Sequence, residues 1–412
     1  MGLQDTPHSQ RLTIGFFGKT NSGKSSILNM LTGQETSVVS PAAGTTTDPV
    51  YKAMEIKGLG PVLFIDTAGF DDTSYLGVKR MEKTQGALEK CDIICAVLTP
   101  DEIYTKESGA LPSWFLNIIE TKKDKTAVVL NKTDLFTAPE IQNACECITS
   151  ATNLIPVVMS AAEKKGTVEL QEAFMRLMPS DFCERTITGD LVHKGSLVLL
   201  VMPQDIQAPK GRLILPQVQV TRELLDKKCT ILSCTTDCID EALTSLSREP
   251  DLIITDSQVF KIVSEKKPPK SLLTSFSVLL AANKGSIEDF VQGAKAIEKL
   301  TPSSRVLIAE ACTHAPLTED IGREKIPAML RKKYGQTIAV DIVSGTDFPE
   351  DLSPYDLVIH CGGCMFNRTY VLSRQNKAKT STVPMTNYGI TIAFLNGILD
   401  EVCWPQNEHT CA

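Results

Sequence analysis

The sequence predicts an α/β protein with three domains, each built on a parallel sheet. Three observations lead to this fold class. Short apolar runs alternate with helix-like segments, which is typical of parallel strands covered by helices. The length of 412 residues is enough for two or three domains with separate cores. Several apolar runs end in glycine-rich or cysteine-bearing turns, where such sheets bind ligands. We expect a doubly wound N-terminal domain at 1–180, a small middle domain at 181–266 and a C-terminal domain at 267–412.

Composition and charge exclude several classes of protein. The chain has 42 Lys and Arg against 49 Asp and Glu, a net charge of −7, so it lacks the basic footprint of a nucleic-acid-coating protein. No stretch of about 18 consecutive apolar residues indicates a membrane span. Residues 1–11 are polar and do not resemble a signal peptide. The 13 cysteines are an odd number, which full intrachain pairing cannot use. We therefore expect a cytoplasmic protein whose clustered cysteines serve metal or redox chemistry.

The first motif follows the apolar run Leu12–Phe17. Residues 18–25 fit G-x-x-x-x-G-K-[ST], and a helical pattern continues from Ser26. A glycine-rich loop between strand and helix turns backbone N–H groups toward phosphates. We expect Lys24 to reach the β- and γ-phosphates and Ser25 to coordinate Mg²⁺. The residues expected around the phosphates are Gly18, Asn21, Ser22, Gly23, Lys24, Ser25 and Ser26.

Three further motifs end apolar runs in the order that a guanine-nucleotide site requires. Asp66 to Gly69 reads D-x-x-G, which suits a water-mediated Mg²⁺ contact and a γ-phosphate sensor. An N-K-x-D motif and an S-A pair follow later runs, and they comprise Asn131, Lys132, Asp134, Ser160 and Ala161. A carboxylate in the N-K-x-D motif can accept two hydrogen bonds from guanine, which adenine cannot offer. The S-A backbone can donate to the guanine O6. Together the motifs resemble the translation-factor class of GTPases and imply bound GTP and Mg²⁺.

The catalytic device of this domain is predicted from a second resemblance. Phe70 stands where Ras-like GTPases have a water-orienting glutamine, and a phenyl ring cannot orient water. Asn21 and the sequence Gly-Thr45-Thr46 resemble the potassium-activated GTPases. That resemblance implies that Asn21 and Thr45 hold K⁺ between the phosphates and that Thr46 closes on Mg²⁺. These three residues would support catalysis together with Lys24. The alternative is that Asn21 only caps the loop.

The middle domain shows a fold signal without a chemical one. Apolar runs at 196–202, 229–234 and 251–255 alternate with helical patterns and predict a three-stranded parallel sheet. Such a sheet has open edges that must be covered, so this domain is the candidate homodimer interface. Three cysteines lie close together here, and we interpret them as core residues or helix caps: Cys229, Cys234 and Cys238.

The C-terminal domain carries a set of metal-binding residues. Predicted strands at 304–309 and 355–359 are followed by C-x-H and H-C-x-x-C sequences, and these comprise Cys312, His314, His360, Cys361 and Cys364. The carboxyl ends of parallel strands meet at one crevice, so these side chains can converge. Three thiolates are one short of a complete 4Fe–4S ligand set, which leaves one iron for an exchangeable ligand such as either histidine. A structural Cys₃His zinc site is the alternative.

The combination of these features resembles the maturation GTPases of FeFe-hydrogenase over nearly the whole chain. It consists of potassium-type GTPase motifs, a middle segment that reads Gly-Arg-Leu-Ile-Leu-Pro-Gln at 211–217, and the C-x-H and H-C-x-x-C residues. The resemblance implies a scaffold that binds a 4Fe–4S cluster, receives a diiron precursor from two radical-SAM maturases and delivers it to apo FeFe-hydrogenase. GTP hydrolysis would regulate these partners. The alternative function is a GTPase of RNA modification or ribosome assembly with a structural zinc domain, which the acidic charge disfavours.

Overall fold

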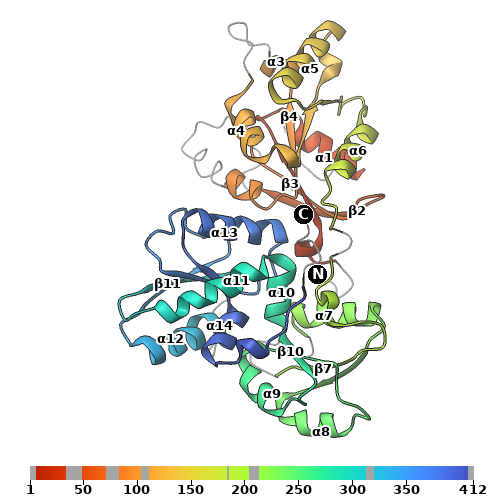
Figure 1. Cartoon of the computed structure of the whole chain (residues 1–412). Helices are drawn as coiled ribbons and strands as arrows, with labels where there is room; N and C mark the ends of the chain where they lie inside the picture. The colour runs from red at the N-terminus through yellow and green to blue at the C-terminus, as the bar shows by residue number, and fades with distance from the viewer. Residues whose placement is uncertain are drawn as a thin grey trace. The chain divides into compact units, whose positions relative to one another are not determined.

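The chain forms two compact units, residues Met1–Cys183 and Glu184–Ala412. The computed structural model describes residues 6–33, 49–70, 83–103, 111–182, 185–203, 213–311 and 320–406 (Figure 1). Three sheets, one in the first unit and two in the second, confirm the predicted α/β class. The residue bounds that the sequence predicts for three domains stay a prediction.

The first unit is a six-stranded sheet in the order β2-β3-β1-β4-β5-β6. Only β2 is antiparallel to its neighbour among these strands. Every residue of β1 and β4 is buried, which explains why these strands are continuous apolar runs in the sequence. The strands are β1 (Leu12–Phe17), β2 (Val50–Ile56), β3 (Gly60–Asp66), β4 (Ile93–Leu98), β5 (Thr126–Leu130) and β6 (Val157–Val158).

Helices cover both faces of this sheet. Leu28 of α1 and Phe174 of α6 belong to the apolar cluster on one face, whereas Phe115 of α4 and Ile148 of α5 belong to a second cluster. The parallel strands therefore end together at one edge, from which all the predicted nucleotide motifs start. The helices are α1 (Lys24–Thr32), α3 (Pro100–Ile103), α4 (Ser113–Lys122), α5 (Ala138–Thr152) and α6 (Thr167–Leu177).

The second unit contains two four-stranded parallel sheets. Their orders are β10-β9-β7-β8 and β12-β11-β13-β14. The first sheet has one strand more than the sequence predicts, because β10 pairs with β9. The strands are β7 (Leu197–Val201), β8 (Thr230–Cys234), β9 (Leu252–Thr255), β10 (Leu272–Ser275), β11 (Arg305–Glu310), β12 (Ala339–Ser344), β13 (Leu357–His360) and β14 (Met385–Asn387).

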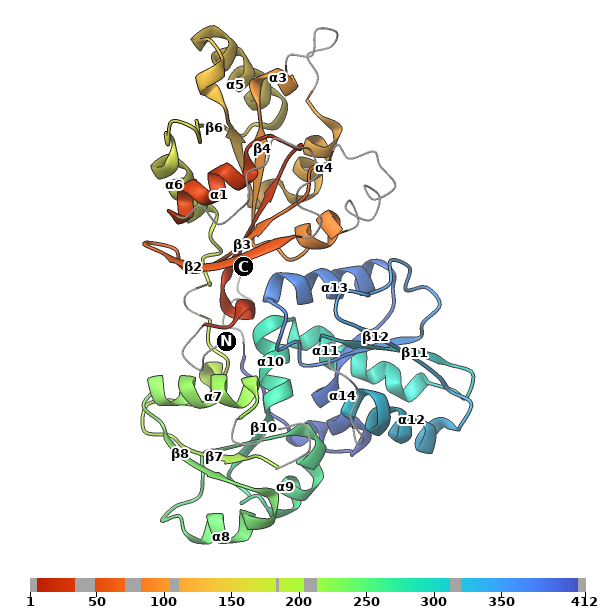
Figure 2. The same ribbon diagram turned by 180° about the vertical axis from the view of Figure 1, so that it is seen from behind.

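The helices of the second unit pack on both sheets. Figures 1 and 2 show α12 and α13 on opposite sides of the sheet that contains β11. These helices are α7 (Leu215–Asp226), α8 (Ile239–Thr244), α9 (Phe260–Lys266), α10 (Phe276–Lys284), α11 (Ile287–Ala294), α12 (Ile326–Tyr334), α13 (Arg368–Thr380) and α14 (Tyr388–Leu395). None of the helices in the described part of the chain is long and apolar enough to cross a membrane.

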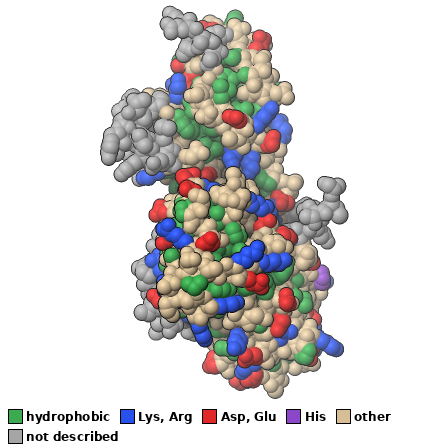
Figure 3. All heavy atoms as spheres, turned by 60° about the vertical axis from the view of Figure 1, so that its left-hand side comes forward, with side chains coloured by type: hydrophobic (Ala, Val, Ile, Leu, Met, Phe, Trp, Pro, Cys, Tyr) green, Lys and Arg blue, Asp and Glu red, His purple; other side chains and the backbone are tan. Residues whose placement is uncertain are grey.

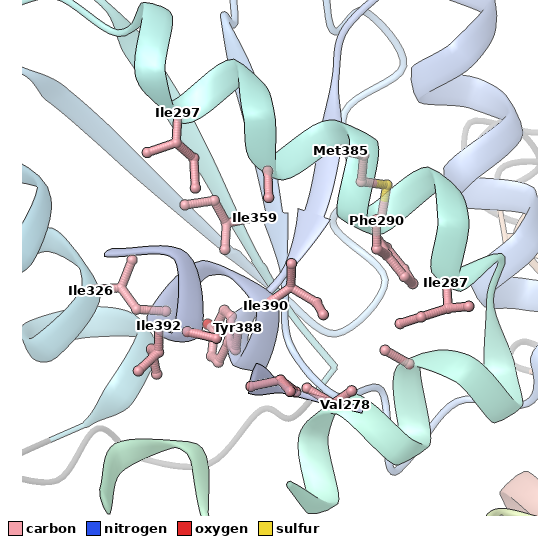
Figure 4. Packing of buried hydrophobic residues seen from close by; sticks show 14 of the residues in the cluster. Val278, Ile287, Phe290, Ile297, Ile326, Ile359, Met385, Tyr388, Ile390 and Ile392 are labelled. Carbon is pink, nitrogen blue, oxygen red and sulfur yellow. The ribbon is translucent and has the colours of Figure 1, made fainter. Parts of the chain in front are cut away.

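One continuous apolar core joins the two sheets of the second unit. It includes Ile253 of β9 and Ile359 of β13, so residues of both sheets contribute to the same cluster. Figure 4 shows Val278 of α10, Phe290 of α11 and Ile390 of α14 converging within it. Ala311, which follows β11, and Cys361, which follows β13, both pack in or against this core. On the surface, acidic and basic side chains are interspersed over the face shown in Figure 3.

Candidate functional site

The phosphate loop runs from β1 to α1 and is organised around Lys24. The Lys24 side chain is only 7% exposed. Its Nζ donates hydrogen bonds to the backbone oxygens of Gly18 at 3.1 Å and Lys19 at 2.7 Å. The loop thus encloses the ammonium group, as a loop built to receive phosphates requires. Ser22 is buried in the loop, and Ser26 lies in the first turn of α1.

Gly23 is needed where the phosphate loop meets the predicted guanine motif. Its φ angle is +94°, in the left-handed region that side chains rarely adopt. A Cβ atom at this position would lie 2.2 Å from Asn131 Nδ2. Asn131 Nδ2 instead donates a hydrogen bond to the Ser22 carbonyl oxygen at 2.9 Å. The structure therefore brings the phosphate loop and the N-K-x-D motif together.

The two predicted magnesium-site residues of the first unit also lie together. Ser25 Oγ donates a hydrogen bond to Asp66 Oδ2 at 2.5 Å. Burial raises the pKa of the Asp66 carboxyl group, while the bond from Ser25 and the charge of Lys24 oppose this shift. The predicted ligands Thr45 and Thr46 lie outside the described residues.

The predicted guanine-binding residues form one hydrogen-bonded group at the ends of β5 and β6. Ser160 Oγ donates to Asp134 Oδ1 at 2.6 Å, and the Ala161 N–H donates to Asn131 Oδ1 at 3.1 Å. Lys132 has a φ angle of +61° and turns the chain between the two acceptors. The side chains that should read the base are therefore fixed by one another.

Phe70 is held away from polar chemistry by aromatic packing. It follows Gly69 and stacks on Trp114 with ring centroids 5.1 Å apart and an angle of 11°. It also packs against Phe17 at 6.3 Å. Since neither the phenyl ring nor its packing can orient water, the catalytic device must lie elsewhere. Asn21 is exposed in the phosphate loop with a φ angle of +62°.

The second candidate site lies where the parallel strands β11 and β13 end. Cys361 directly follows β13, and its neighbour β11 is followed by Ala311. The Ala311 N–H donates a hydrogen bond to Cys361 Sγ at 3.0 Å. The predicted ligands Cys312 and His314 lie outside the described residues. Ala311, the last described residue before Cys312 in the sequence, thus lies against the Cys361 thiol.

The Cys361 thiol sits in a turn that donates backbone hydrogen bonds to sulfur. Gly363 has a φ angle of +63°, and its N–H lies 3.4 Å from Cys361 Sγ. Burial, with the nearby Cys364, raises the pKa of Cys361 to about 11, and the two backbone donors partly oppose this. Without metal the thiol is therefore protonated at neutral pH, and a bound metal would displace the proton.

His360 is surrounded differently from what a metal ligand requires. It is fully buried, with Nδ1 2.7 Å from the Cys361 carbonyl oxygen and Nε2 3.0 Å from Arg374. A carbonyl only accepts and a guanidinium only donates, so Nδ1 carries the proton and Nε2 accepts. Burial first, and then Arg374, lowers the pKa of His360 to about 3. Both ring nitrogens are thus engaged, so His360 in this arrangement offers no lone pair to iron.

Two buried cations beside this turn were missed by sequence reasoning. Lys284 ends α10, and burial lowers its pKa to about 8, while Cys364 and Cys361 oppose the shift. Arg374 lies within 4.5–4.7 Å of the rings of Phe348, Phe366 and Tyr370. A single Lys or Arg in a helix is usually a solvated residue. The available sequence signal for Lys284 is its place at the end of a largely apolar helix.

The residues present fit an iron–sulfur cluster in their chemistry. Within the ranges that the structure describes, no three His, Cys, Asp or Glu side chains gather as a metal site. The described part supplies two sulfurs, Cys361 and Cys364, in a turn whose N–H groups face sulfur. The third sulfur of the predicted set, that of Cys312, belongs to the segment just beyond Ala311. Thiolates with backbone N–H donors around them are what such clusters require.

Comparison with solved structures finds GTP-binding proteins. Era from Aquifex aeolicus, bound to GDP and AlF4⁻, is 19% identical with a TM-score of 0.36, over 57% of this chain and 98% of its own. NFeoB from S. thermophilus, bound to GDP, AlF4⁻ and K⁺, is 18% identical with a TM-score of 0.30, over 39% of this chain and 60% of its own.

Curated relatives are similar in sequence over part of the chain. The GTPase Der of Wolinella succinogenes is 34% identical over 202 residues, which are 45% of this chain and 41% of Der. The tRNA modification GTPase MnmE of Natranaerobius thermophilus is 35% identical over 167 residues, 39% of this chain and 33% of MnmE. This chain thus spans about two fifths or less of the length of these relatives.

Family models account for most of the chain. Residues 13–132 match the 50S ribosome-binding GTPase family, so the first unit contains a GTPase domain. Residues 187–285 match the hydrogen maturase F dimerization domain, and residues 288–405 match the hydrogen maturase F tetramerization domain. The two maturase matches together cover more than half of the sequence, and they include Cys361 and Cys364. The chain therefore belongs to the hydrogen maturase F family.

Proposed function

We propose that the chain is a GTP-hydrolysing scaffold that holds a 4Fe–4S cluster and delivers a diiron precursor to apo FeFe-hydrogenase. One observation carries this proposal. In a chain of the hydrogen maturase F family, the turn after β11 donates a backbone hydrogen bond to Cys361 Sγ after β13. This contact supports our proposal that Cys312, Cys361 and Cys364 would meet at the carboxyl edge of a parallel sheet.

The first unit would bind and hydrolyse GTP. Lys24, in place of its bonds to loop carbonyls, would bind the phosphates, and Ser25 with Asp66 would hold Mg²⁺, directly or through water. Asp134 would accept from guanine while Asn131 keeps the phosphate loop against the base motif. Because Phe70 is apolar, we assign charge neutralisation to K⁺ held by Asn21 and Thr45, with Thr46 on Mg²⁺.

The second unit would hold the cluster through Cys312, Cys361 and Cys364. Three thiolates leave one iron with an exchangeable ligand, for which His314 is the remaining histidine candidate. Such a cluster supplies an open coordination position at which a metal fragment can be held or exchanged. The diiron unit is the cargo, received from radical-SAM maturases and passed to the hydrogenase. Matches to dimerization and tetramerization domains support an oligomeric scaffold, with a homodimer as its smallest form.

A second candidate function has some support from the relatives. MnmE is named as a tRNA modification GTPase, and the matched GTPase family as ribosome-binding. A chain with that function would use the cysteines for structural zinc. The net charge of −7 disfavours this alternative, because RNA binding needs clustered positive charge.

Metal analysis of reconstituted protein tests the proposal. The wild-type chain, incubated anaerobically with iron and sulfide, should become brown and bind about four irons per chain. Cys361→Ser should lose most of this iron, whereas Cys238→Ser, in the same unit but after β8, should keep it. A colourless wild type that retains only zinc would overturn the proposal.

Two activity measurements complete the test. Lys24→Ala should abolish GTP hydrolysis and leave the iron content intact, since the two sites lie in different compact units. Wild-type chain loaded with a synthetic diiron complex should activate apo FeFe-hydrogenase, whereas unloaded chain should not. Failure of the loaded chain to activate the hydrogenase would contradict the carrier role.

A further inference from the structure

A buried ammonium group lies against the turn that carries Cys361 and Cys364. Lys284 is 3% exposed at the end of α10. Its Nζ donates hydrogen bonds to the carbonyl oxygens of Gly363 at 2.9 Å, Cys364 at 3.1 Å and Phe366 at 2.6 Å. An ammonium has three protons, so each of them is committed to this turn. Lys284 thus connects α10 to a segment some eighty positions further along the chain.

A second buried cation lies near the turn. Arg374 is 2% exposed on the other flank, where it binds His360 Nε2 and the Gly345 carbonyl oxygen. In the part of the chain that the structure describes, neither Lys284 nor Arg374 forms an ion pair with an Asp or Glu side chain. Buried charges are normally paired or serve a metal site, because the desolvation of an unpaired ion is costly.

An iron–sulfur cluster would supply the missing negative charge. Three thiolates outweigh the positive charge of an oxidised 4Fe–4S core, so the assembled group is an anion, and reduction adds a further negative charge. The neutral His360 cannot contribute such a charge, and Glu310 is already paired with Arg323 at 2.9 Å. The two cations are therefore matched to the proposed ligand in sign and in position.

We propose that Lys284 is a positioning residue of the cluster site, which fixes the 361–366 turn through three carbonyl oxygens and compensates the charge of the bound cluster. This inference rests on the proposed scaffold function and extends it to a residue outside the cysteine motif. A partner beyond the first ligands commonly changes metal affinity by about 10–100-fold. Loss of the positive charge also makes reduction of the cluster harder, because the added electron is no longer stabilised.

The test compares Lys284→Met with a second lysine that ends a helix and donates to a distant carbonyl oxygen. Lys227 caps α7 in the same unit, donates to the carbonyl oxygen of Gly189 at 2.6 Å and lies 3.6 Å from Glu223, far along the chain from Cys361 and Cys364. Lys227→Met is therefore the matched control. Both variants and the wild type are reconstituted with iron and sulfide, after which bound iron, rate of iron loss to a chelator and reduction potential are measured.

The expected result is specific to Lys284. Lys284→Met should lose iron to the chelator about ten times faster than wild type and be reduced at a more negative potential, while Lys227→Met matches the wild type. Unfolding of each variant by urea separates a folding defect from a site defect, and Lys284→Arg keeps the charge without the compact ammonium. Lys284→Arg should recover the reduction potential, because the positive charge is kept. It should not recover the slow loss of iron, because the three carbonyl bonds that fix the turn are lost.

Two outcomes overturn the inference and can be told apart. If the wild type takes up no cluster, the scaffold function fails and the inference fails with it. If the wild type takes up a cluster and Lys284→Met equals it in chelation rate and potential, only the role of Lys284 is refuted. A folded Lys284→Met chain with a normal potential would also refute the electrostatic half.

Discussion

Asn131 is the residue whose removal should most directly disconnect the phosphate loop from the guanine motif. Its side chain is 1% exposed and makes two bonds, to the Ser22 carbonyl oxygen at 2.9 Å and from the Ala161 N–H at 3.1 Å. Asn131→Ala leaves both backbone groups without these partners. Orphaning the buried Ser22 carbonyl costs about 1–3 kcal/mol and orphaning the partly buried Ala161 N–H costs less, so the free energy of unfolding of the first unit should fall by about 2–4 kcal/mol.

Urea unfolding can measure this loss because the two tryptophans of the chain lie in different units. Trp114 belongs to the first unit and Trp404 to the second, so a Trp404→Phe background isolates the first transition. With a slope of about 1–3 kcal/mol per molar urea, the midpoint should fall by about 1 M or more. The affinity for a fluorescent guanine nucleotide should fall as well, because the loop is no longer fixed.

Asn117→Ala is the matched control, since Asn117 is exposed on α4 and alanine favours a helix. The free energy of unfolding of Asn117→Ala should stay within a few tenths of a kcal/mol of wild type. An Asn131→Ala midpoint equal to that of the control would refute the reasoning that this side chain connects the two motifs.

Three further predictions concern specificity, cation dependence and pH. Asp134→Asn should weaken GTP binding about 10–100-fold, because a charge-assisted hydrogen bond is lost, and favour xanthosine triphosphate; competition binding with unchanged guanine preference would show the base site is misassigned. GTP hydrolysis should be roughly ten-fold or more faster in K⁺ than in Na⁺, and Asn21→Ala should lose the difference; equal wild-type rates in both salts would exclude the K⁺ role. Burial lowers the pKa of His360 from 6.5 to about 3, so this side chain is neutral in the folded state. Below pH 6.5 the unfolded state binds more protons, and the stability of the folded state therefore decreases as the pH is lowered. Urea unfolding of the second unit should give a free energy of unfolding about 2 kcal/mol lower at pH 5 than at pH 7.5, and His360→Gln should reduce this difference. A difference of the same size in that variant would contradict the assignment.

The buried parallel strands were the most predictable part of the fold. The run Leu12–Phe17 was predicted with the bounds that the structure has, because every residue of β1 is buried and Thr13 is the one polar side chain in the strand. The strand Leu272–Ser275 was missed, since two of its four residues are polar and its buried Thr274 and Ser275 give no apolar signal. The strand Met385–Asn387 is too short for any periodicity to show.

The site residues, like the strands, were predictable where neighbours in sequence define them and were not predictable where tertiary contacts define them. The nucleotide residues lie within contiguous motifs, and their expected neighbours are in contact, as the Ser25–Asp66 bond shows. The surroundings of His360 depend on Arg374, which no local pattern connects with it. Lys284 likewise approaches the cysteine turn only after two sheets have packed on a common core. Physical proximity of this kind is a product of tertiary packing, which a single sequence does not display.

The two candidate sites share a device that also explains how they should differ. In both, a buried lysine donates to loop carbonyl oxygens, Lys24 to Gly18 and Lys284 to Gly363, beside a loop expected to take an anion. Lys24 starts α1, whose positive end attracts the phosphates themselves and favours exchange of carbonyls for phosphate. Lys284 ends α10, where the negative end of the helix favours the ammonium in its present place. Lys24 should therefore exchange carbonyl oxygens for phosphate in each round of GTP hydrolysis. Lys284 should instead keep its carbonyl partners whether or not the cluster is bound.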